Sequence, residues 1–406
     1  MEIGLNGYRG IDNDDKMAEL QDFGCGWIKI SFGLAELSDG DKGEIIRFEQ
    51  MQVDDLLARA ERLAEYGMRT VVDVRTTSQL LHKLPRERMK ELTEAERADW
   101  EAAPDIERRR MLRERTKRLN LDIVDQIGQM TYDLVGQCEY IIKDWEWWGE
   151  HGCPHVTMGT LPSGDYSLFL SAFYGAAKQA APGCRVWNGG DGVQPNTHWL
   201  GLMVRPPQAT EQEHMWFPQG VGEYFDVCNW HPYLVTLGPG NEDYGLSDVI
   251  GKFDEVFGES RKLLDFYGKG QPFASTEWGL AMVDDVVLEA LKDPQGRPIL
   301  KSYTYTPGYV ALPVSHSAEW FEACLECFDR HKFEVLCIHS YTEEYDKDTA
   351  MREANHWGSF CGLKDLYGTK RPAWYVVRDR ARAGYGTAFK GESNEPLGDQ
   401  ADSECV

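Results

Sequence analysis

The segments GWIKISF (residues 26–32) and MRTVVDV (residues 68–74) decide the fold, because each is a short and nearly continuous apolar run. Runs of this length predict strands that are buried on both faces, as in a parallel sheet covered by helices. An amphipathic stretch at 53–66 lies between them and predicts a helix. The repeating unit is therefore a strand followed by a helix.

The same alternation continues along the whole chain. Further strands are predicted at 3–8, 139–147, 185–190, 225–231, 272–278 and 333–341. Further helices are predicted at 13–23, 105–137, 165–181, 245–267, 316–331 and 372–383. Eight such units over this length favour a closed (β/α)8 TIM barrel of the α/β class over an open doubly wound sheet. No GxGxxG turn follows the first strand, which argues against a dinucleotide-binding fold.

One barrel domain is expected over residues 1–385, followed by a polar tail at 386–406. A charged stretch at about 80–128, between the third and fourth strands, predicts a long helical insertion. Its run ERRRMLRERTKR suggests an RNA-binding arm, but interleaved acidic residues and the lack of aromatic partners favour a solvated helical face. At the C-terminal face of the barrel it would form a wall or lid, or mediate dimerisation.

The charge balance limits the partners of the chain. Its 406 residues include 43 Lys+Arg and 67 Asp+Glu, a formal net charge of −24. Such a surface repels nucleic acid and anionic membranes, so neither is expected as a partner. No apolar run reaches the ~18 residues of a membrane helix. The N-terminus MEIGLNGYRG lacks a signal pattern, so a cytoplasmic location is expected, or secretion if a leader has been removed.

The ten cysteines lie in strand-like or helical apolar contexts, where buried thiols are expected rather than a disulfide framework. The one CxxC, from Cys324 to Cys327, lies in a helical run without a second pair. A zinc or redox role is therefore not expected for it.

Two predicted strand ends carry a glutamate beside tryptophan and glycine. Glu150 follows the fourth strand in DWEWWGEHG, and Glu277 closes the seventh in PFASTEWG. Barrel active sites form at the C-terminal ends of strands, so the two carboxylates are expected to face each other across the mouth. Glycoside hydrolysis uses such a pair, with retention of configuration at a separation of about 5–5.5 Å. Either glutamate alone would equally fit a solvated strand end.

Four segments resemble clan A retaining glycoside hydrolases. WEWWGE (145–150) resembles the W-E-x-W-N-E segment that ends strand four of that clan, and STEWG (275–279) resembles its strand-seven nucleophile segment. NWHPY (229–233) is similar to the strand-six H-x-Y segment, and WGSFCGLKDLYGTKRPAWYVV (357–377) to the closing stretch. The resemblance spans about residues 1–385 and is nearest to the β-xylosidase and endoglycanase-like branch.

The resemblance implies a general acid/base, Glu150, and a nucleophile, Glu277. It places His231 and Tyr233 near the nucleophile. No metal and no organic cofactor are expected. The full set of substrate-binding candidates is His231, Tyr233, Trp278, Gly149, Lys29, Arg9, Asn6, Trp187 and Tyr341.

Two positions depart from the clan pattern. Gly149 stands where the clan usually has Asn, which donates to the 2-hydroxyl of the sugar, and Lys29 stands where Arg is common. Our hypothesis for Gly149 is a substrate that lacks an ordinary 2-hydroxyl or carries a bulkier group there. Lys provides a point charge rather than a bidentate fork, so the exchange at position 29 is not neutral.

The sequence therefore predicts a retaining glycoside hydrolase that cleaves a β-linked glycoside by double displacement. The alternative is a catalytically altered barrel that acts as a carbohydrate-binding or scaffolding protein. A metal-dependent barrel hydrolase is weakened because strand one ends in GLNGYRG, without histidine. Asp144 and Glu146 lie deeper in the fourth strand, where a buried structural role is expected. A carbohydrate is the expected partner, and homo-oligomerisation is left open.

Overall fold

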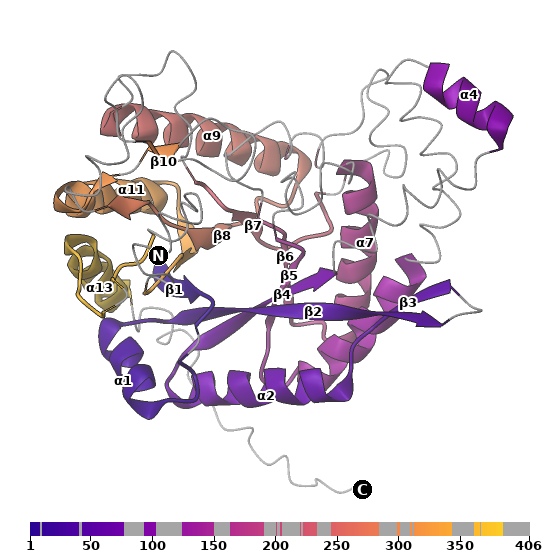
Figure 1. The fold of residues 1–406 in the computed structure, drawn as a ribbon, viewed down its shortest axis with the longest axis horizontal. Coiled ribbons are helices and arrows are strands. Elements are labelled where there is room, and N and C mark those ends of the chain that lie inside the picture. The colour runs from indigo at the N-terminus through magenta and orange to yellow at the C-terminus, as the bar shows by residue number, and fades with distance from the viewer. Residues whose placement is uncertain are drawn as a thin grey trace, which may run out of the picture.

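The structure is a computed structural model, and eight parallel strands in it form a nearly closed barrel with helices outside (Figure 1). The predicted (β/α)8 class is confirmed. The structure describes residues 1–8, 10–39, 43–76, 93–102, 124–149, 163–190, 200, 204, 220, 222–233, 245–283, 299–300, 309–310, 312–342, 361–365 and 367–384.

The barrel strands pair in the order β6-β5-β4-β2-β1-β13-β8-β7. A parallel bridge between Trp187 and Val227 joins β6 to the segment before β7 and completes the ring. The strands are β1 (Glu2–Asn6), β2 (Trp27–Asp39), β4 (Arg69–Thr76), β5 (Asp144–Trp147), β6 (Arg185–Asn188), β7 (Cys228–Trp230), β8 (Phe273–Trp278) and β13 (Phe333–Ile338).

Most helices of the described residues surround these strands in Figure 1, whereas α4 is drawn apart from them at the upper right. They are α1 (Asp14–Phe23), α2 (Gln50–Glu65), α4 (Glu94–Ala102), a helix over 124–138, α7 (Ser163–Ala180), α9 (Leu246–Tyr267), α11 (Ser317–Arg330), α13 (Pro372–Gly384) and the short η2 (Val314–His316). Each of the larger helices packs through residues spaced three or four apart, as with Val53, Leu56, Ala60 and Leu63 of α2. Burial of such a stripe is the main source of helix stability in a barrel.

Short strands lie outside the ring. They are β3 (Gly43–Arg47), β9 (Met282–Val283), β10 (Ile299–Leu300), β11 (Tyr309–Val310) and β12 (Leu312–Pro313). β3 pairs antiparallel with β2 residues 35–39, beyond the part of β2 that pairs with β4. This hairpin was not predicted. The predicted fourth strand also began too early, because residues 139–141 form a turn after the helix that ends at 138.

Two apolar layers hold the barrel. The larger lies between strands and helices, and the smaller fills the barrel interior with Trp27, Val71, Trp187, Val227, Ala274, Val335 and Cys337. The cysteines that the structure describes are buried and unbridged, as expected. Within the described ranges, we find no helix with the length and apolar character required to span a bilayer. Most of the predicted insertion at 80–128 and the tail at 386–406 lie outside the described residues.

Candidate active site at the barrel mouth

Glu277 lies at the C-terminal end of β8, where its carboxylate meets two side chains that follow β7. The Tyr233 hydroxyl donates to Glu277 Oε1 at 2.9 Å. His231 Nδ1 lies 3.9 Å from Glu277 Oε2, and the glutamate side chain is 15% exposed. The structure therefore brings together three of the predicted site residues around a carboxylate that a ligand can still reach.

His231 is fully buried and lies between β8 and β5. Its Nε2 is 2.9 Å from Thr276 Oγ1 and 3.9 Å from Glu146 Oε1. Gly190 makes room for this ring, because a Cβ at that position would lie 2.1 Å from His231 Cδ2. Gly190 of the WNGG turn thus serves the packing of the histidine.

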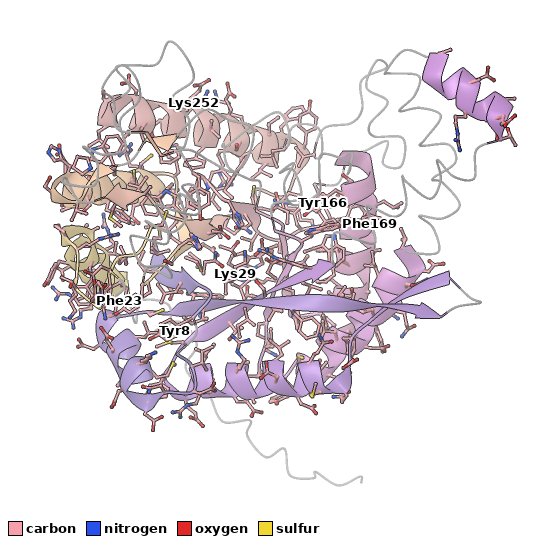
Figure 2. The ribbon with its side chains drawn as sticks, viewed as in Figure 1. Tyr8, Phe23, Lys29, Tyr166, Phe169 and Lys252 are labelled. Atoms are coloured by element: carbon pink, nitrogen blue, oxygen red, sulfur yellow. The ribbon has the colours of Figure 1, made fainter. Side chains whose placement is uncertain are left out.

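Four charged side chains form what we call the mouth cluster: Lys29 of β2, Asp73 and Arg75 of β4, and Glu146 of β5. Lys29 Nζ lies 3.2 Å from Asp73 Oδ2 and 3.4 Å from Glu146 Oε2, with all three side chains fully buried. Arg75 donates from Nε to Asp73 and is 33% exposed. Figure 2 labels Lys29 near the centre of the molecule. Buried charges of both signs in one place are typical of functional sites.

Burial and pairing act against each other on the pKa values of this cluster. Burial would raise the pKa of Asp73, but the charges of Arg75 and Lys29 and the Gly149 N–H lower it to about 2. Burial, together with the charge of Asp73, raises the pKa of Glu146. Burial would lower the pKa of Lys29, yet Asp73 and Glu146 more than offset this and raise it. Lys29 is therefore a permanent positive charge in the barrel.

Gly149 lies directly against the mouth cluster. Trp148 before it has φ 55°, in the left-handed region, and the Gly149 N–H donates to Asp73 Oδ1 at 3.1 Å. A Cβ on Gly149 would lie 3.0 Å from Asp73 Oδ2 and from Glu146 Oε1, and 3.1 Å from Arg75 Nη2. Charged side-chain atoms thus crowd the space beside Gly149, which favours glycine at this position. The hypothesis of an unusual carbon-2 substituent stays a prediction.

A cavity of about 860 Å³ opens beside the cluster, between the ends of β1, β2 and β13. Asn6, Lys29, His339 and Tyr341 line it. Asn6 Nδ2 lies 3.3 Å from His339 Nδ1, and the Tyr341 hydroxyl donates to Glu19 Oε1 at 3.1 Å. Three predicted substrate-binding residues therefore share one cavity with His339.

Two predicted tryptophans are placed elsewhere. Trp278 is fully buried, with ring centroids 5.0 Å from both Phe321 and Phe328 of α11. Neighbouring residues of a strand point to opposite faces, so Trp278 faces the helices while Glu277 faces the mouth. Trp187 is buried inside the barrel and donates from Nε1 to Asp144 Oδ1 at 2.9 Å. Both side chains are fully buried, and neither is among the residues that line the cavity beside the mouth cluster.

The remaining predictions divide into two groups. Glu150 and Arg9 lie outside the described residues, so their positions at the mouth stay predictions. Asp144 is buried and also accepts from Arg185 Nε at 2.7 Å, in keeping with the structural role expected for it. Burial raises the pKa of Asp144, while Arg185 opposes the shift.

Sequence reasoning missed two residues of the mouth cluster, Asp73 and Arg75. Their signal is present in VVDVRT, where residues 71, 73 and 75 alternate along one face of β4. An acidic and a basic residue on the inward face of a valine-rich strand indicate a charged interior. Asn229 was also missed, and its Nδ2 donates to Thr276 Oγ1 at 2.8 Å.

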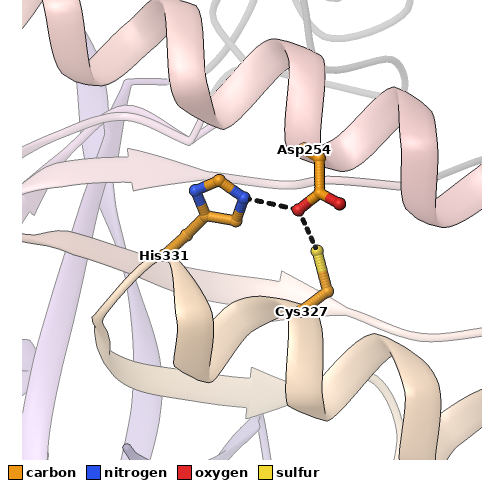
Figure 3. Close-up of side chains that lie close together, drawn as sticks. All are labelled: Asp254, Cys327 and His331. Atoms are coloured by element: carbon orange, nitrogen blue, oxygen red, sulfur yellow. Dashed lines mark hydrogen bonds and ion pairs between the residues drawn. The ribbon is translucent and has the colours of Figure 1, made fainter.

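A second group of ionisable side chains joins α9 to α11, and we call it the helix cluster: Asp254, Cys327, Arg330 and His331. His331 Nε2 lies 2.8 Å from Asp254 Oδ1, and Cys327 Sγ lies 3.5 Å from the same oxygen (Figure 3). The ligand atoms of Asp254, Cys327 and His331 are close enough to hold a metal ion. However, Arg330 Nη2 contacts both carboxylate oxygens at 3.1 Å, so this carboxylate is already neutralised and the group is an interhelical ion pair.

Comparisons with known proteins find the fold rather than a family. No protein-family profile and no curated protein matches the chain. A subfamily 18 member of glycoside hydrolase family 5 from Bifidobacterium longum subsp. infantis is similar, with a TM-score of 0.55, 13% identity, and coverage of 94% of this chain and 79% of that one. A family 5 subfamily 4 broad specificity endoglucanase from Clostridium cellulovorans gives a TM-score of 0.54 at 10% identity, covering 95% and 94%.

A family 39 glycoside hydrolase from Bacteroides cellulosilyticus WH2 gives a TM-score of 0.52 at 12% identity, covering 94% of this chain. This chain spans 63% of that protein, less than two thirds of its length. These identities establish a shared barrel. The chemistry of the mouth has to be argued from its own residues.

Proposed function

We propose that this chain is a retaining glycoside hydrolase that cleaves a β-linked glycoside by double displacement, with Glu277 as nucleophile and Glu150 as general acid/base. One observation carries the proposal: the Glu277 carboxylate lies at the mouth, bonded to Tyr233 and next to His231. The solved structures described above are of glycoside hydrolases, and a variant of a similar family 5 subfamily 18 protein, from Bifidobacterium longum subsp. longum, was solved in complex with Manβ1-4GlcNAc. A carbohydrate is therefore the proposed substrate.

The geometry around Glu277 suits a carboxylate that must attack while ionised. The Tyr233 hydroxyl holds Oε1 at 2.9 Å and fixes the orientation of the other oxygen. Lys29 and Arg75 add positive charge, since the pKa of each is raised in part by Glu277. Hydrogen bonds and cations both favour the charged form of an acid. These contacts suit a carboxylate that has to attack in its ionised form.

In the first step, a Glu277 oxygen attacks the anomeric carbon and forms an ester while the bond to the leaving oxygen breaks. Glu150 gives its proton to that oxygen, and the alcohol departs. In the second step Glu150 takes a proton from water, and the water oxygen attacks the same carbon. The ester breaks, Glu277 returns as a carboxylate, and the sugar leaves with its configuration retained.

The test is covalent trapping of the first intermediate. A panel of 2-deoxy-2-fluoro glycosides with good leaving groups should add one sugar mass to the intact protein, and peptide mapping should place it on Glu277. Glu277→Gln should abolish labelling and lower turnover of aryl glycosides by ~10³-fold or more. The melting temperature should stay close to that of the wild type, because residue 277 is at an open mouth.

The control is Arg378→Gln on α13, whose guanidinium bonds to the neighbouring Asp379. It should label and turn over like the wild type. Sugar binding without labelling or turnover, unchanged in Glu277→Gln, would instead identify a carbohydrate-binding or scaffolding barrel. Labelling at another carboxylate would contradict the assignment of Glu277.

A further inference from the structure

Arg75 is the cation of the mouth cluster that a ligand can reach. Its side chain is 33% exposed, whereas Lys29 is fully buried. Within the described residues its guanidinium makes one hydrogen bond, from Nε to Asp73. The two terminal amino groups therefore remain available to a bound molecule. A guanidinium offers two parallel N–H donors, a geometry that matches a carboxylate or sulfate.

The neighbours of Arg75 indicate that its guanidinium lies near the sugar that Glu277 would attack. Its Nη2 lies 3.1 Å from the point where a Cβ of residue 149 would be. Position 149 directly precedes Glu150, and Glu277 is among the charges that raise the pKa of Arg75. The guanidinium thus lies beside the place where a side chain at 149 would begin, together with carboxylate oxygens of Asp73 and Glu146.

The cavity beside the cluster offers one further cation to a ligand. Lys16, Lys29, Arg59 and Lys364 line it together with one carboxylate, Glu19, which is paired with Lys364. Lys29 is paired with Asp73 and Glu146, and Arg59 lies 3.9 Å from Asp55. Lys16 has no ion pair in the part of the chain that the structure describes, so its ammonium group can attract an acidic group of a ligand.

We propose that the substrate is an anionic glycan, and that Arg75 binds a carboxylate or sulfate of the sugar held beside Glu277. This inference rests on the proposed hydrolase function and names its substrate class. Lys16 of the cavity then attracts an acidic group farther along the glycan. Arg75 would act in binding and specificity, with no part in bond making.

The experiment compares aryl glycosides that differ in a single group. p-Nitrophenyl β-glycosides of the gluco and galacto series are each used as the neutral sugar, the 6-carboxylate and the 2-sulfate. We expect kcat/KM for one of the anionic forms to exceed that of its neutral parent by ~10-fold or more, and the excess to fall as NaCl is raised. Comparison of the 6-carboxylate with the 2-sulfate shows which of the two anionic groups is preferred.

Arg75→Gln should remove about 10- to 100-fold of kcat/KM on the preferred anionic substrate, mainly through KM, and far less on its neutral parent. Arg75→Lys should fold even if Arg75→Gln does not, and should keep part of the preference. Arg378→Gln is the control and should leave the preference intact.

Two results would overturn the inference while leaving the hydrolase proposal in place. One is faster turnover of the neutral parent in both series. The other is an equal loss on neutral and anionic substrates in both Arg75 variants, which would make Arg75 a structural residue. No turnover of any of the six substrates, with no fluorosugar labelling of Glu277, would instead reject both proposals.

Discussion

The mouth cluster and the helix cluster each contain an aspartate that accepts from an arginine, in different surroundings. Asp73 and Lys29 at the mouth are fully buried, whereas Asp254 and Arg330 between the helices are 45% and 50% exposed. Burial removes water as an alternative partner, so each charge at the mouth depends on its neighbours. Between the helices water can replace any partner that is lost.

The largest effect is expected from Lys29→Met. The substitution leaves Asp73 and Glu146 buried and close together with one cation fewer, so the free energy of unfolding should fall by about 3–5 kcal/mol. Turnover should fall as well, because Lys29 supplies positive charge to the mouth. Urea unfolding at pH 7 measures the first effect.

Lys252→Met is the matched control. Lys252 lies on the surface of α9 (Figure 2) and pairs with Glu255 at 2.8 Å, with both side chains about half exposed. Its loss should change the free energy of unfolding by no more than ~0.5 kcal/mol. Equal effects of the two substitutions would show that burial does not separate the two kinds of ion pair.

The barrel could be predicted from the sequence because the pattern that indicates each strand and helix is local. Apolar runs such as MRTVVDV and helical spacing such as that of α2 report burial directly. The β2–β3 hairpin was not predicted because it lies beyond residues 26–32, which alone already fit the pattern of a buried strand. Its existence depends on pairing between residues 35–39 and 43–47 rather than on burial in the barrel.

The candidate site could be predicted only in part from the sequence. The contacts among Glu277, His231 and Tyr233 could be anticipated because these residues end a strand or follow one, where barrel sites form. The burial of Trp278 could also have been anticipated, since a residue next to Glu277 on a strand must face the other way. Arg75 was missed because its role depends on Asp73 and Gly149, and the contact between β4 and β5 that joins them is tertiary.

The second largest effect is expected for Asp73, in the way that the free energy of unfolding depends on pH. The folded pKa of Asp73, about 2, is below its ordinary value of 3.8, so the folded state favours the ionised form. This contribution, about 2 kcal/mol, is present above pH 4 and is lost as the pH falls from about 4 to about 2. Asp73→Asn should therefore be less stable at pH 7 and should lose less stability than the wild type over that acid range.

Urea unfolding of both proteins at several pH values between 2 and 7 gives the comparison. The two curves should converge toward the acid end, because protonation of Asp73 in the wild type removes the same charge that the substitution removes. Parallel curves would mean that Asp73 titrates as it does in the unfolded chain. The positive charges of Arg75 and Lys29 would then not lower the pKa of Asp73 in the folded protein.

The smallest effect is expected from Asp254→Asn in the helix cluster. The amide keeps a hydrogen-bond acceptor for Arg330 and His331, and exposed ion pairs contribute little, so the free energy of unfolding should change by less than ~1 kcal/mol. Burial would raise the pKa of Asp254, but its bonds to His331 and Arg330 lower it, so any change should be fully present above pH 4 and should be lost as the pH falls through the lowered folded pKa. A loss as large as that of Lys29→Met would show that the contacts between α9 and α11 stabilise the barrel as strongly as its buried charges do. The difference in exposure between the two clusters would then not explain why charged side chains are kept buried at the mouth.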